Sequence, residues 1–136
     1  MSPAAEPVVV LRMPARAEYL VLARLALSGL AHTVELDPEI LADLKLAVTE
    51  ACANAARHAY EDEGRVTLRL AADESEVRIE IEDEGAGFAG IHAHAEPELL
   101  PEDGMGLAII RAVVDELQVG SGEGGRGTRL QLLKRL

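Results

Sequence analysis

Apolar residues recur at three- and four-residue steps between Leu41 and Tyr60, in the stretch LADLKLAVTEACANAARHAY. Neither Gly nor Pro interrupts this pattern, which predicts one amphipathic helix. Within it lies a polar stripe whose members, at about 100° per residue, share an arc of about 100° on the helix surface. The stripe consists of Glu50, Asn54, Arg57 and His58. Because Asn is unfavourable inside a helix, the stripe indicates either a solvated face or a binding site.

Two further stretches have helical periodicity. One runs from Ala15 to Leu30, and the other from Gly104 to Leu117, where glycines precede the apolar residues. The start of the central helix is also predicted, because Asp37 is a favourable N-cap and Pro38 suits the first helical position.

Short β-branched or alternating runs predict the strands. The first begins with a proline, which favours an edge strand. The turn Asp73-Glu74-Ser75 separates the second run from the third, so these two are expected to form a hairpin. Val119 is a candidate start for a further strand, followed by a turn over Gly120–Gly127. The four predicted strands are Pro7–Arg12, Arg65–Ala72, Glu76–Asp83 and Thr128–Leu133.

This order of elements predicts an α+β fold. We expect a two-layer α/β sandwich, with three helices on one face of a mixed, mainly antiparallel sheet. At 136 residues the chain is long enough for one domain with a real core, and residues 1–6 resemble a loose tail.

The charge of the chain restricts its partners. It has 24 acidic and 13 basic residues, a formal net charge of −11, which argues against direct nucleic-acid binding. The single cysteine, Cys52, excludes an intrachain disulfide and is expected to be a small buried residue. The most apolar stretch, Tyr19 to Ala31, is too short to span a bilayer, and we expect a cytoplasmic protein.

Asp83 is the first candidate for binding chemistry. Alternation along Glu76–Asp83 puts this residue on the same side as the apolar, core-facing positions. A buried carboxylate needs a hydrogen-bond donor, which a ligand amino group could supply. Gly85 and Gly87 follow and allow the backbone to approach such a ligand closely. The alternative explanation is an ordinary hairpin turn with an Asx cap.

Two glycine-rich segments are further candidates. Gly104-Met105-Gly106-Leu107 is expected to open a helix, where bare amide groups and the helix dipole favour an anion. Gly125-Arg126-Gly127-Thr128 precedes the last strand and positions a hydroxyl group there. Either segment taken alone is also typical of a simple turn.

Taken in order, these motifs resemble the ATP-binding fold shared by gyrase, Hsp90, the histidine kinases and MutL. The order is Glu-x3-Asn-x2-Arg-His on a helix, Asp-x-Gly-x-Gly after a strand, Gly-x-Gly-Leu at a helix start and Gly-Thr on the last strand. With TEACANAARHAY, EDEGAGF and DGMGLAII at these spacings, the chain is similar to the bacterial anti-sigma factor serine/threonine protein kinases. The resemblance extends from Val8 to Leu133.

The resemblance implies a role for each motif residue. Glu50 matches the general base that activates the serine hydroxyl of a protein substrate. Asn54 matches the side chain that binds a magnesium ion at the ATP phosphates. Asp83 matches the carboxylate that binds the adenine amino group. The other nucleotide-binding positions are Arg57 and His58 beside Asn54, Gly85 and Gly87 at the adenine, Gly104, Met105, Gly106 and Leu107 at the phosphates, and Thr128 near the adenine.

The resemblance also implies partners. Such a protein binds an RNA polymerase sigma factor and phosphorylates a small anti-anti-sigma antagonist protein, using ATP and magnesium in the cytoplasm. No contact with nucleic acid or a membrane is expected, and the family allows a homodimer.

The segment from Ala89 to Asp103, AGIHAHAEPELLPED, departs from the family pattern because it contains no Lys or Arg. Phosphoryl transfer depends on cationic groups that neutralise developing charge. Two alternatives therefore stay open: an ATP-dependent partner-binding regulator with weak or no kinase activity, and an activator subunit of another signalling enzyme. His92 and His94 have the spacing of a metal pair on a strand, but no third ligand matches them, and a mobile lid is the favoured interpretation.

Overall fold

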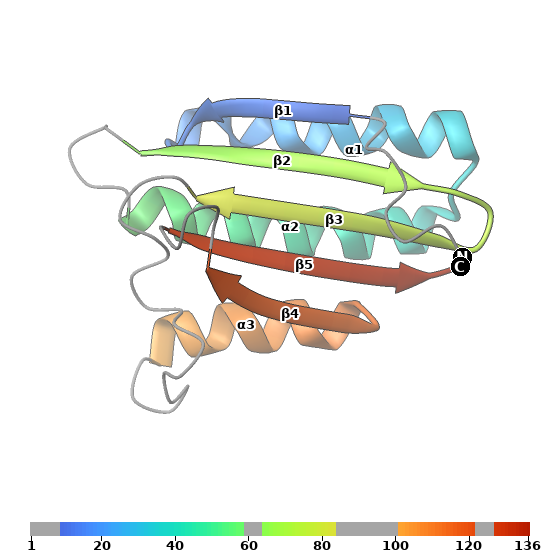
Figure 1. Cartoon of the computed structure of the whole chain (residues 1–136). Coiled ribbons are helices and arrows are strands. Elements are labelled where there is room, and N and C mark those ends of the chain that lie inside the picture. The colour runs from blue at the N-terminus through green and yellow to red at the C-terminus, as the bar shows by residue number, and fades with distance from the viewer. Residues whose placement is uncertain (1–8, 59–63, 84–100, 122–126) are drawn as a thin grey trace.

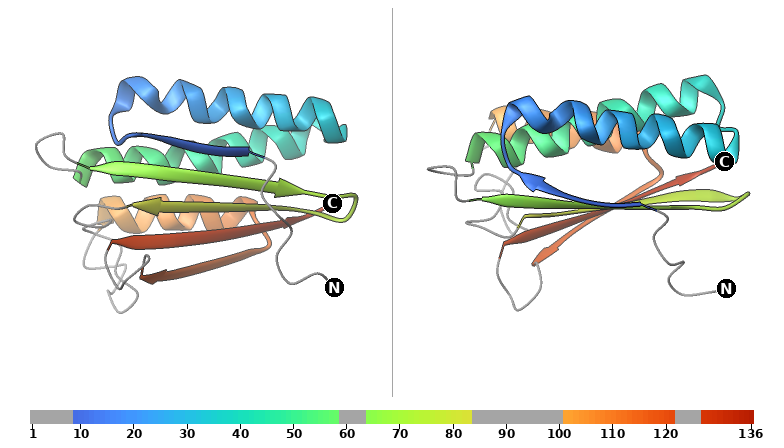
Figure 2. Two further views of the ribbon diagram at one scale, coloured as in Figure 1. Left: turned by 45° about the horizontal axis from the view of Figure 1, so that its top comes forward. Right: turned by 90° about the horizontal axis from the view of Figure 1, so that it is seen from above.

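The computed structural model describes the backbone of residues 9–58, 64–83, 101–121 and 127–136, and the side chains of these ranges except 54–58, 101–106 and 121. The described residues form two layers, a five-stranded sheet and three α-helices that cover one of its faces (Figures 1 and 2). The predicted two-layer α+β architecture is confirmed. The elements are β1 (Val9–Pro14), η1 (Ala17–Tyr19), α1 (Leu20–Val34), α2 (Pro38–His58), β2 (Arg65–Ala72), β3 (Glu76–Asp83), α3 (Pro101–Val113), β4 (Glu116–Ser121) and β5 (Thr128–Arg135).

The strand order is β1-β2-β3-β5-β4, and each of these neighbouring pairs is antiparallel. The sequence allowed a mixed sheet; the four described pairings contain no parallel pair. After β3 the chain passes through α3 to the edge strand β4. It then returns along β5, which lies between β3 and β4 in the sheet (Figure 1). The predicted edge position of the first strand is confirmed.

The central helix begins where its capping residues predict. The Oδ1 atom of Asp37 accepts the backbone N–H of Glu39 at 2.7 Å, and Pro38 is the first helical residue. The helix continues without a break to His58. Among the described helices, none is long and apolar enough to cross a membrane.

Strands β2 and β3 have the bounds that the sequence predicts. The turn between them is stabilised by its first residue, Asp73. The Oδ1 atom of Asp73 accepts hydrogen bonds from the backbone and hydroxyl of Ser75 and from the backbone of Glu76, at 2.7, 2.8 and 3.0 Å. These bonds to Ser75 and Glu76 hold the pKa of Asp73 below its usual value.

The first helix begins later than predicted, and the first strand runs past its predicted end at Arg12, while the predicted start of that strand at Pro7 lies outside the described residues. Strand β1 extends through Pro14, because an edge strand tolerates a residue without an N–H group. The backbone N–H of Ala15 then bonds to the Gly64 carbonyl at 3.1 Å, which delays the helix. Helix α1 runs past the predicted Leu30 to Val34, and Glu35 ends it in the left-handed conformation, with φ 58°.

The prediction for the third helix was wrong at both ends. Helix α3 begins at Pro101, because proline suits a first helical position, and it ends at Val113 rather than Leu117. Leu117 belongs to β4, whose start was predicted at Val119. Pairing with β5 places Leu117 opposite Leu132, and this long-range pairing outweighs the local helical pattern.

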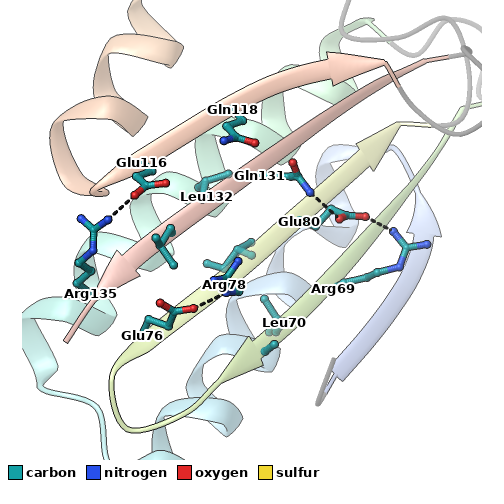
Figure 3. A pocket seen from close by; sticks show the side chains of 13 residues that line it. Arg69, Leu70, Glu76, Arg78, Glu80, Glu116, Gln118, Gln131, Leu132 and Arg135 are labelled. Carbon is teal, nitrogen blue, oxygen red and sulfur yellow. Dashed lines mark hydrogen bonds and ion pairs between the residues drawn. The ribbon is translucent and has the colours of Figure 1, made fainter. Parts of the chain in front are cut away.

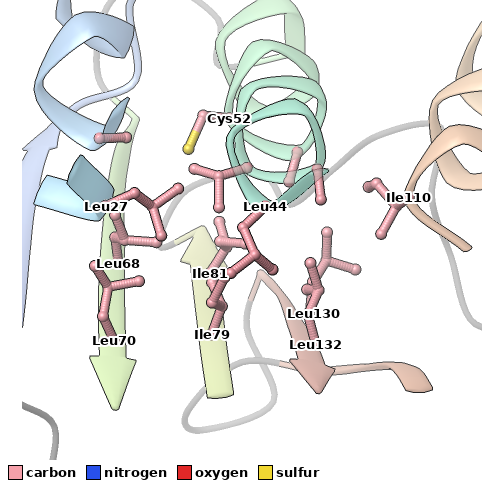
Figure 4. Close-up of a cluster of buried hydrophobic side chains, with 14 of the residues drawn as sticks. Leu27, Leu44, Cys52, Leu68, Leu70, Ile79, Ile81, Ile110, Leu130 and Leu132 are labelled. Atoms are coloured by element: carbon pink, nitrogen blue, oxygen red, sulfur yellow. The ribbon is translucent and has the colours of Figure 1, made fainter. Parts of the chain in front are cut away.

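The core lies between the layers, with Leu27 from α1, Leu44 from α2, Ile110 from α3 and Leu68 and Ile81 from the sheet (Figure 4). Each of these side chains is at most 1% exposed. Since this packing encloses the sheet-facing side of all three helices, it fixes the position of α2 above the central strands.

None of the described helices lies over the other face of the sheet, which carries charged side chains (Figure 2). Arg69 bonds to Glu80 at 2.7 Å and to Glu82 at 3.1 Å, while Arg129 lies 3.7 Å from Glu80 and 3.6 Å from Glu82. Two arginines on β2 and β5 therefore hold two glutamates on β3 between them. Glu82, which is 6% exposed, thus has an arginine partner on each neighbouring strand.

Candidate functional site

Four element ends meet at one end of the two-layer structure. Strand β3 ends there, β5 begins there, α2 ends there and α3 begins there (Figure 1). These are the elements that carry the motif residues of the sequence, although the motifs are far apart along the chain. The fold therefore gathers them into one region.

Asp83 and Thr128 are two buried polar residues of this region, paired at the end of neighbouring strands. Asp83 is the last residue of β3 and is 1% exposed, which confirms its predicted core-facing phase. Thr128, the first residue of β5, is directly opposite Asp83 in the register and is 5% exposed. A carboxylate and a hydroxyl at the rim of an apolar core suit a planar ligand that offers an N–H donor to the carboxylate.

Helix α2 contributes the polar stripe. Glu50 is half-buried, and on the adjoining, core-facing side of the helix Leu44, Ala47, Val48 and Ala51 are fully buried. Because the helix is continuous to His58, Glu50 and Asn54 are one turn apart on the same face. The side chains of Asn54, Arg57 and His58 lie outside the described side chains.

The structure describes the backbone of the glycine motif at Gly104–Leu107. Gly104, Met105 and Gly106 lie inside α3 rather than at its start, since the helix begins at Pro101. The helix residues whose amides lack an intrahelical partner are thus 102 and 103, before Gly104 and about one turn earlier than predicted. The side chain of Leu107 is 9% exposed and packs in the core, and its backbone lies beyond the free amides of the first turn, so its predicted place at the phosphates gains no support.

Gly85 and Gly87, together with His92 and His94, lie outside the described residues, as does most of the segment 89–103. In the part of the chain that is described, no group of three or more His, Cys, Asp or Glu side chains could hold a metal ion. A magnesium ion bound by one amide oxygen, phosphate oxygens and waters needs no such group, and the predicted ligand Asn54 lies outside the described side chains, so its assignment stays a prediction.

Cys52 is a core residue, as predicted. It is 1% exposed, and burial raises the pKa of its thiol to about 12. The thiol is therefore neutral at physiological pH and does not act as a nucleophile.

A hollow of about 670 Å³ lies on the uncovered face of the sheet (Figure 3). Its charged side chains pair with one another: Arg78 with Glu76, Arg135 with Glu116, and Arg69 with Glu80. Because these charges neutralise each other, the hollow is a solvated ion-paired face and a weak candidate for a ligand site. Alternation along Glu76–Asp83 predicts that Arg78, Glu80 and Glu82 share a polar face, but it does not predict which charges pair across strands.

Comparison with known protein families identifies a match over nearly the whole chain. Residues 13–134 are similar to the histidine kinase-like ATPase domain. The serine-protein kinase RsbW of Bacillus mycoides (strain KBAB4) is 34% identical over 124 residues, which cover 84% of this chain and 78% of that protein. The serine-protein kinase RsbW of Bacillus cereus (strain ATCC 10987 / NRS 248) has the same identity and coverage.

Two solved structures resemble the fold. The RsbU and RsbW domains of Rv1364c from Mycobacterium tuberculosis superpose with a TM-score of 0.68 and 25% identity, covering 96% of this chain but 33% of that longer chain. The SiaB-SiaC complex from Pseudomonas aeruginosa gives a TM-score of 0.69 over 96% of this chain and 90% of that chain. At 17% identity the second likeness concerns the fold alone.

Proposed function

The chain belongs to the family of histidine kinase-like ATPase domains, and from this membership we propose that it is an ATP-dependent serine/threonine protein kinase and anti-sigma factor. Its curated relatives are named serine-protein kinases. The observation that supports the site most directly is the buried pair Asp83 and Thr128, at the end of the sheet where α2 ends and α3 begins.

We assign Asp83 to the adenine base. Its carboxylate accepts hydrogen bonds, so it favours the exocyclic amino group of adenine and disfavours the oxo group at the same position of guanine. Thr128 lies beside it on the neighbouring strand and can donate or accept. This arrangement accounts for a preference for ATP over GTP.

Magnesium belongs to the proposal as well. Asn54 would hold the ion through its amide oxygen, with phosphate oxygens and waters completing the shell. When bound, magnesium neutralises charge on the phosphates. The continuous helix brings Asn54 one turn after Glu50, so the metal ligand and the base share one face.

Glu50 is assigned as the general base. The serine oxygen of the protein substrate forms a bond to the terminal phosphorus of ATP, the bond from that phosphorus to the bridging oxygen of ADP breaks, and the serine proton passes to the Glu50 carboxylate. A half-buried carboxylate is accessible to a partner and still held in place by its helix.

The partners follow from the family. We propose that the chain binds a sigma factor and that its phosphoacceptor is a small antagonist protein. A protein that binds partners in an ATP-dependent way with little phosphate transfer is the second candidate, since the segment 89–103 has no Lys or Arg.

The test is transfer of labelled phosphate from ATP to proteins in an extract of the source cells, followed by identification and purification of the acceptor. Glu50→Gln should lower transfer by about 10²–10⁴-fold and leave ATP affinity unchanged. Glu39→Gln, an exposed glutamate on the first turn of the same helix, is the matched control and should transfer normally. If the wild type binds ATP but labels no protein, the kinase proposal fails, and the second candidate, a protein that binds partners in an ATP-dependent way without phosphate transfer, remains.

A further inference from the structure

The charged network on the sheet face opposite the described helices lies directly behind the proposed adenine site. Glu82 precedes Asp83 along β3, and Arg129 follows Thr128 along β5. In the register Glu82 is opposite Arg129, one pair before the pair of Asp83 and Thr128. Because successive residues of a strand point to opposite faces, the charged pair and the site pair are back to back. The network, here called the β3 network, consists of Arg69, Glu80, Glu82 and Arg129.

The carboxylate of the β3 network nearest the site is also deeply buried. The side chain of Glu82 is 8% exposed, whereas the ion-paired side chains of Arg135 and Glu116 on the same face are 59% and 47% exposed. Replacing a buried ion pair by apolar residues is often neutral or stabilising in proteins. Stability alone therefore does not explain why a buried carboxylate lies next to Asp83.

The β3 network joins β3 to both of its neighbours. Arg69 is opposite Glu80 in the register and also bonds diagonally to Glu82. Arg129 is opposite Glu82 and also lies diagonally near Glu80, which accepts a further bond from Gln131 at 3.4 Å. Figure 3 shows Glu80 between Arg69 and Gln131. A shift of either neighbour by one residue would turn its arginine toward the core, so the network fixes the register on both sides of β3.

The pair of Asp83 and Thr128 depends on this register more than any other pair of β3 and β5. It is the last pair of the described ladder, so another pair supports it on one side only. Gly127, which precedes it, has the left-handed conformation with φ 68° and does not extend the strand. Strand ends open more easily than strand centres. The neighbouring pair, Glu82 and Arg129, is therefore what holds the last pair in line.

On the basis of the proposed function, we infer that Glu82 and Arg129 are positioning residues for adenine recognition. Their ion pair keeps the last pair of β3 and β5 aligned, so that the Asp83 carboxylate meets the amino group of adenine in a straight hydrogen bond. Both residues act from the opposite face of the sheet, without contact to the nucleotide. The expected effect is thus on the preference for ATP over GTP, and the contacts of α2 and α3 with the phosphates are unaffected.

Titration calorimetry with ATP and GTP tests the inference. Glu82→Gln should weaken ATP binding by about 10-fold and leave GTP binding unchanged, because a hydrogen bond to a carboxylate weakens steeply when it is misaligned. Arg129→Gln should have an effect in the same direction. Arg129→Lys should keep the preference of the wild type. Arg129 lies 3.6–3.7 Å from the two carboxylates, beyond hydrogen-bond distance, so its charge matters more than its planar shape.

Two control variants separate positioning from a general loss of stability or charge. Ile79→Val removes a methyl group from a side chain that is 2% exposed in the middle of β3, which lowers stability without touching the network. Glu76→Gln removes a carboxylate from the same face at the other end of β3. Both should keep the ATP-to-GTP affinity ratio of the wild type. Urea unfolding and circular dichroism verify that each variant is folded.

A double variant tests whether Glu82 acts through Asp83. In the Asp83→Asn background, Glu82→Gln should cause no further loss of ATP affinity, because the hydrogen bond that it aligns is already absent. An additional 10-fold loss in this background would contradict the inference.

An unchanged affinity ratio in Glu82→Gln and Arg129→Gln would overturn the positioning role. If the wild type prefers ATP and loses that preference in Asp83→Asn, the proposed function survives this result. An equal loss of the ratio in Ile79→Val would also overturn the role, since reduced stability would then be the cause. If Glu82→Gln does not fold, the two Arg129 variants decide in the same way. A wild type that does not bind ATP refutes the proposed function itself, and the positioning role with it.

Discussion

The role of Asp83 can be tested by removing its charge with almost no change in shape. In Asp83→Asn the amide replaces a carboxylate that is 1% exposed, between Val66 and Thr128 on the neighbouring strands. A hydrogen bond to a charged group contributes about 1.5–3 kcal/mol. At about 1.4 kcal/mol per factor of ten, ATP affinity should fall about 10–150-fold.

Titration calorimetry with ATP and GTP measures this effect. The wild type should favour ATP strongly, and Asp83→Asn should lose most of that preference. A second ligand makes the test more specific, namely a purine nucleoside triphosphate without the amino group. It should bind the wild type weakly, and it should bind Asp83→Asn with the same low affinity, because removing the amino group and removing the carboxylate abolish the same hydrogen bond. Glu74→Gln, an exposed change in the turn at the other end of β3, is the control.

Two results would refute the assignment. Equal affinity of the wild type for ATP and GTP would show that the carboxylate does not discriminate between the bases. Additive losses from the substitution and from removal of the amino group would show that the two groups do not contact each other. Thermal unfolding of Asp83→Asn separates either result from a damaged core.

Three further predictions follow. Asn54→Ala should make ATP affinity nearly insensitive to magnesium in the same calorimetric titration; full magnesium dependence in the variant would make Asn54 a structural residue. Glu82→Gln should lower the free energy of unfolding in urea by about 1–3 kcal/mol, because Arg69 and Arg129 lose a charged partner that is nearly buried; an unchanged midpoint would contradict this. The Cys52 thiol should resist a thiol reagent at pH 8 until the protein unfolds, and rapid labelling of the native protein would disprove its burial. Burial raises the pKa of this thiol from 9.0 to about 12, so the contribution of the neutral thiol to stability is present below pH 9 and should be lost as the pH rises toward 12.

Local features of the sequence were sufficient for much of the fold. The cap of Asp37 and the proline after it determine the start of α2, and the Asp73 turn determines the hairpin of β2 and β3. Each of these depends on contacts between residues a few positions apart, so a short stretch of sequence contains the necessary information. The phase of Asp83 follows for the same reason, because alternation along a strand is a local property.

The elements that depend on distant partners could not be located in this way. The end of α3 and the start of β4 were mispredicted, since Leu117 is placed by its pairing with Leu132 and not by the helical pattern before it. The insertion of β5 between β3 and β4 is likewise a matter of pairing between segments far apart in the chain.

For the candidate site, too, some features follow from the sequence and others only from the tertiary structure. The sequence by itself determined which residues are candidates for nucleotide binding, because their types and spacings resemble those of the family motifs. The tertiary structure decided that Asp83 and Thr128, 45 positions apart, are directly opposite each other and buried. It also decided that Leu25 is exposed while Leu27 is buried, although both belong to one apolar run. Burial and proximity depend on which surfaces pack together, and no single segment contains that information.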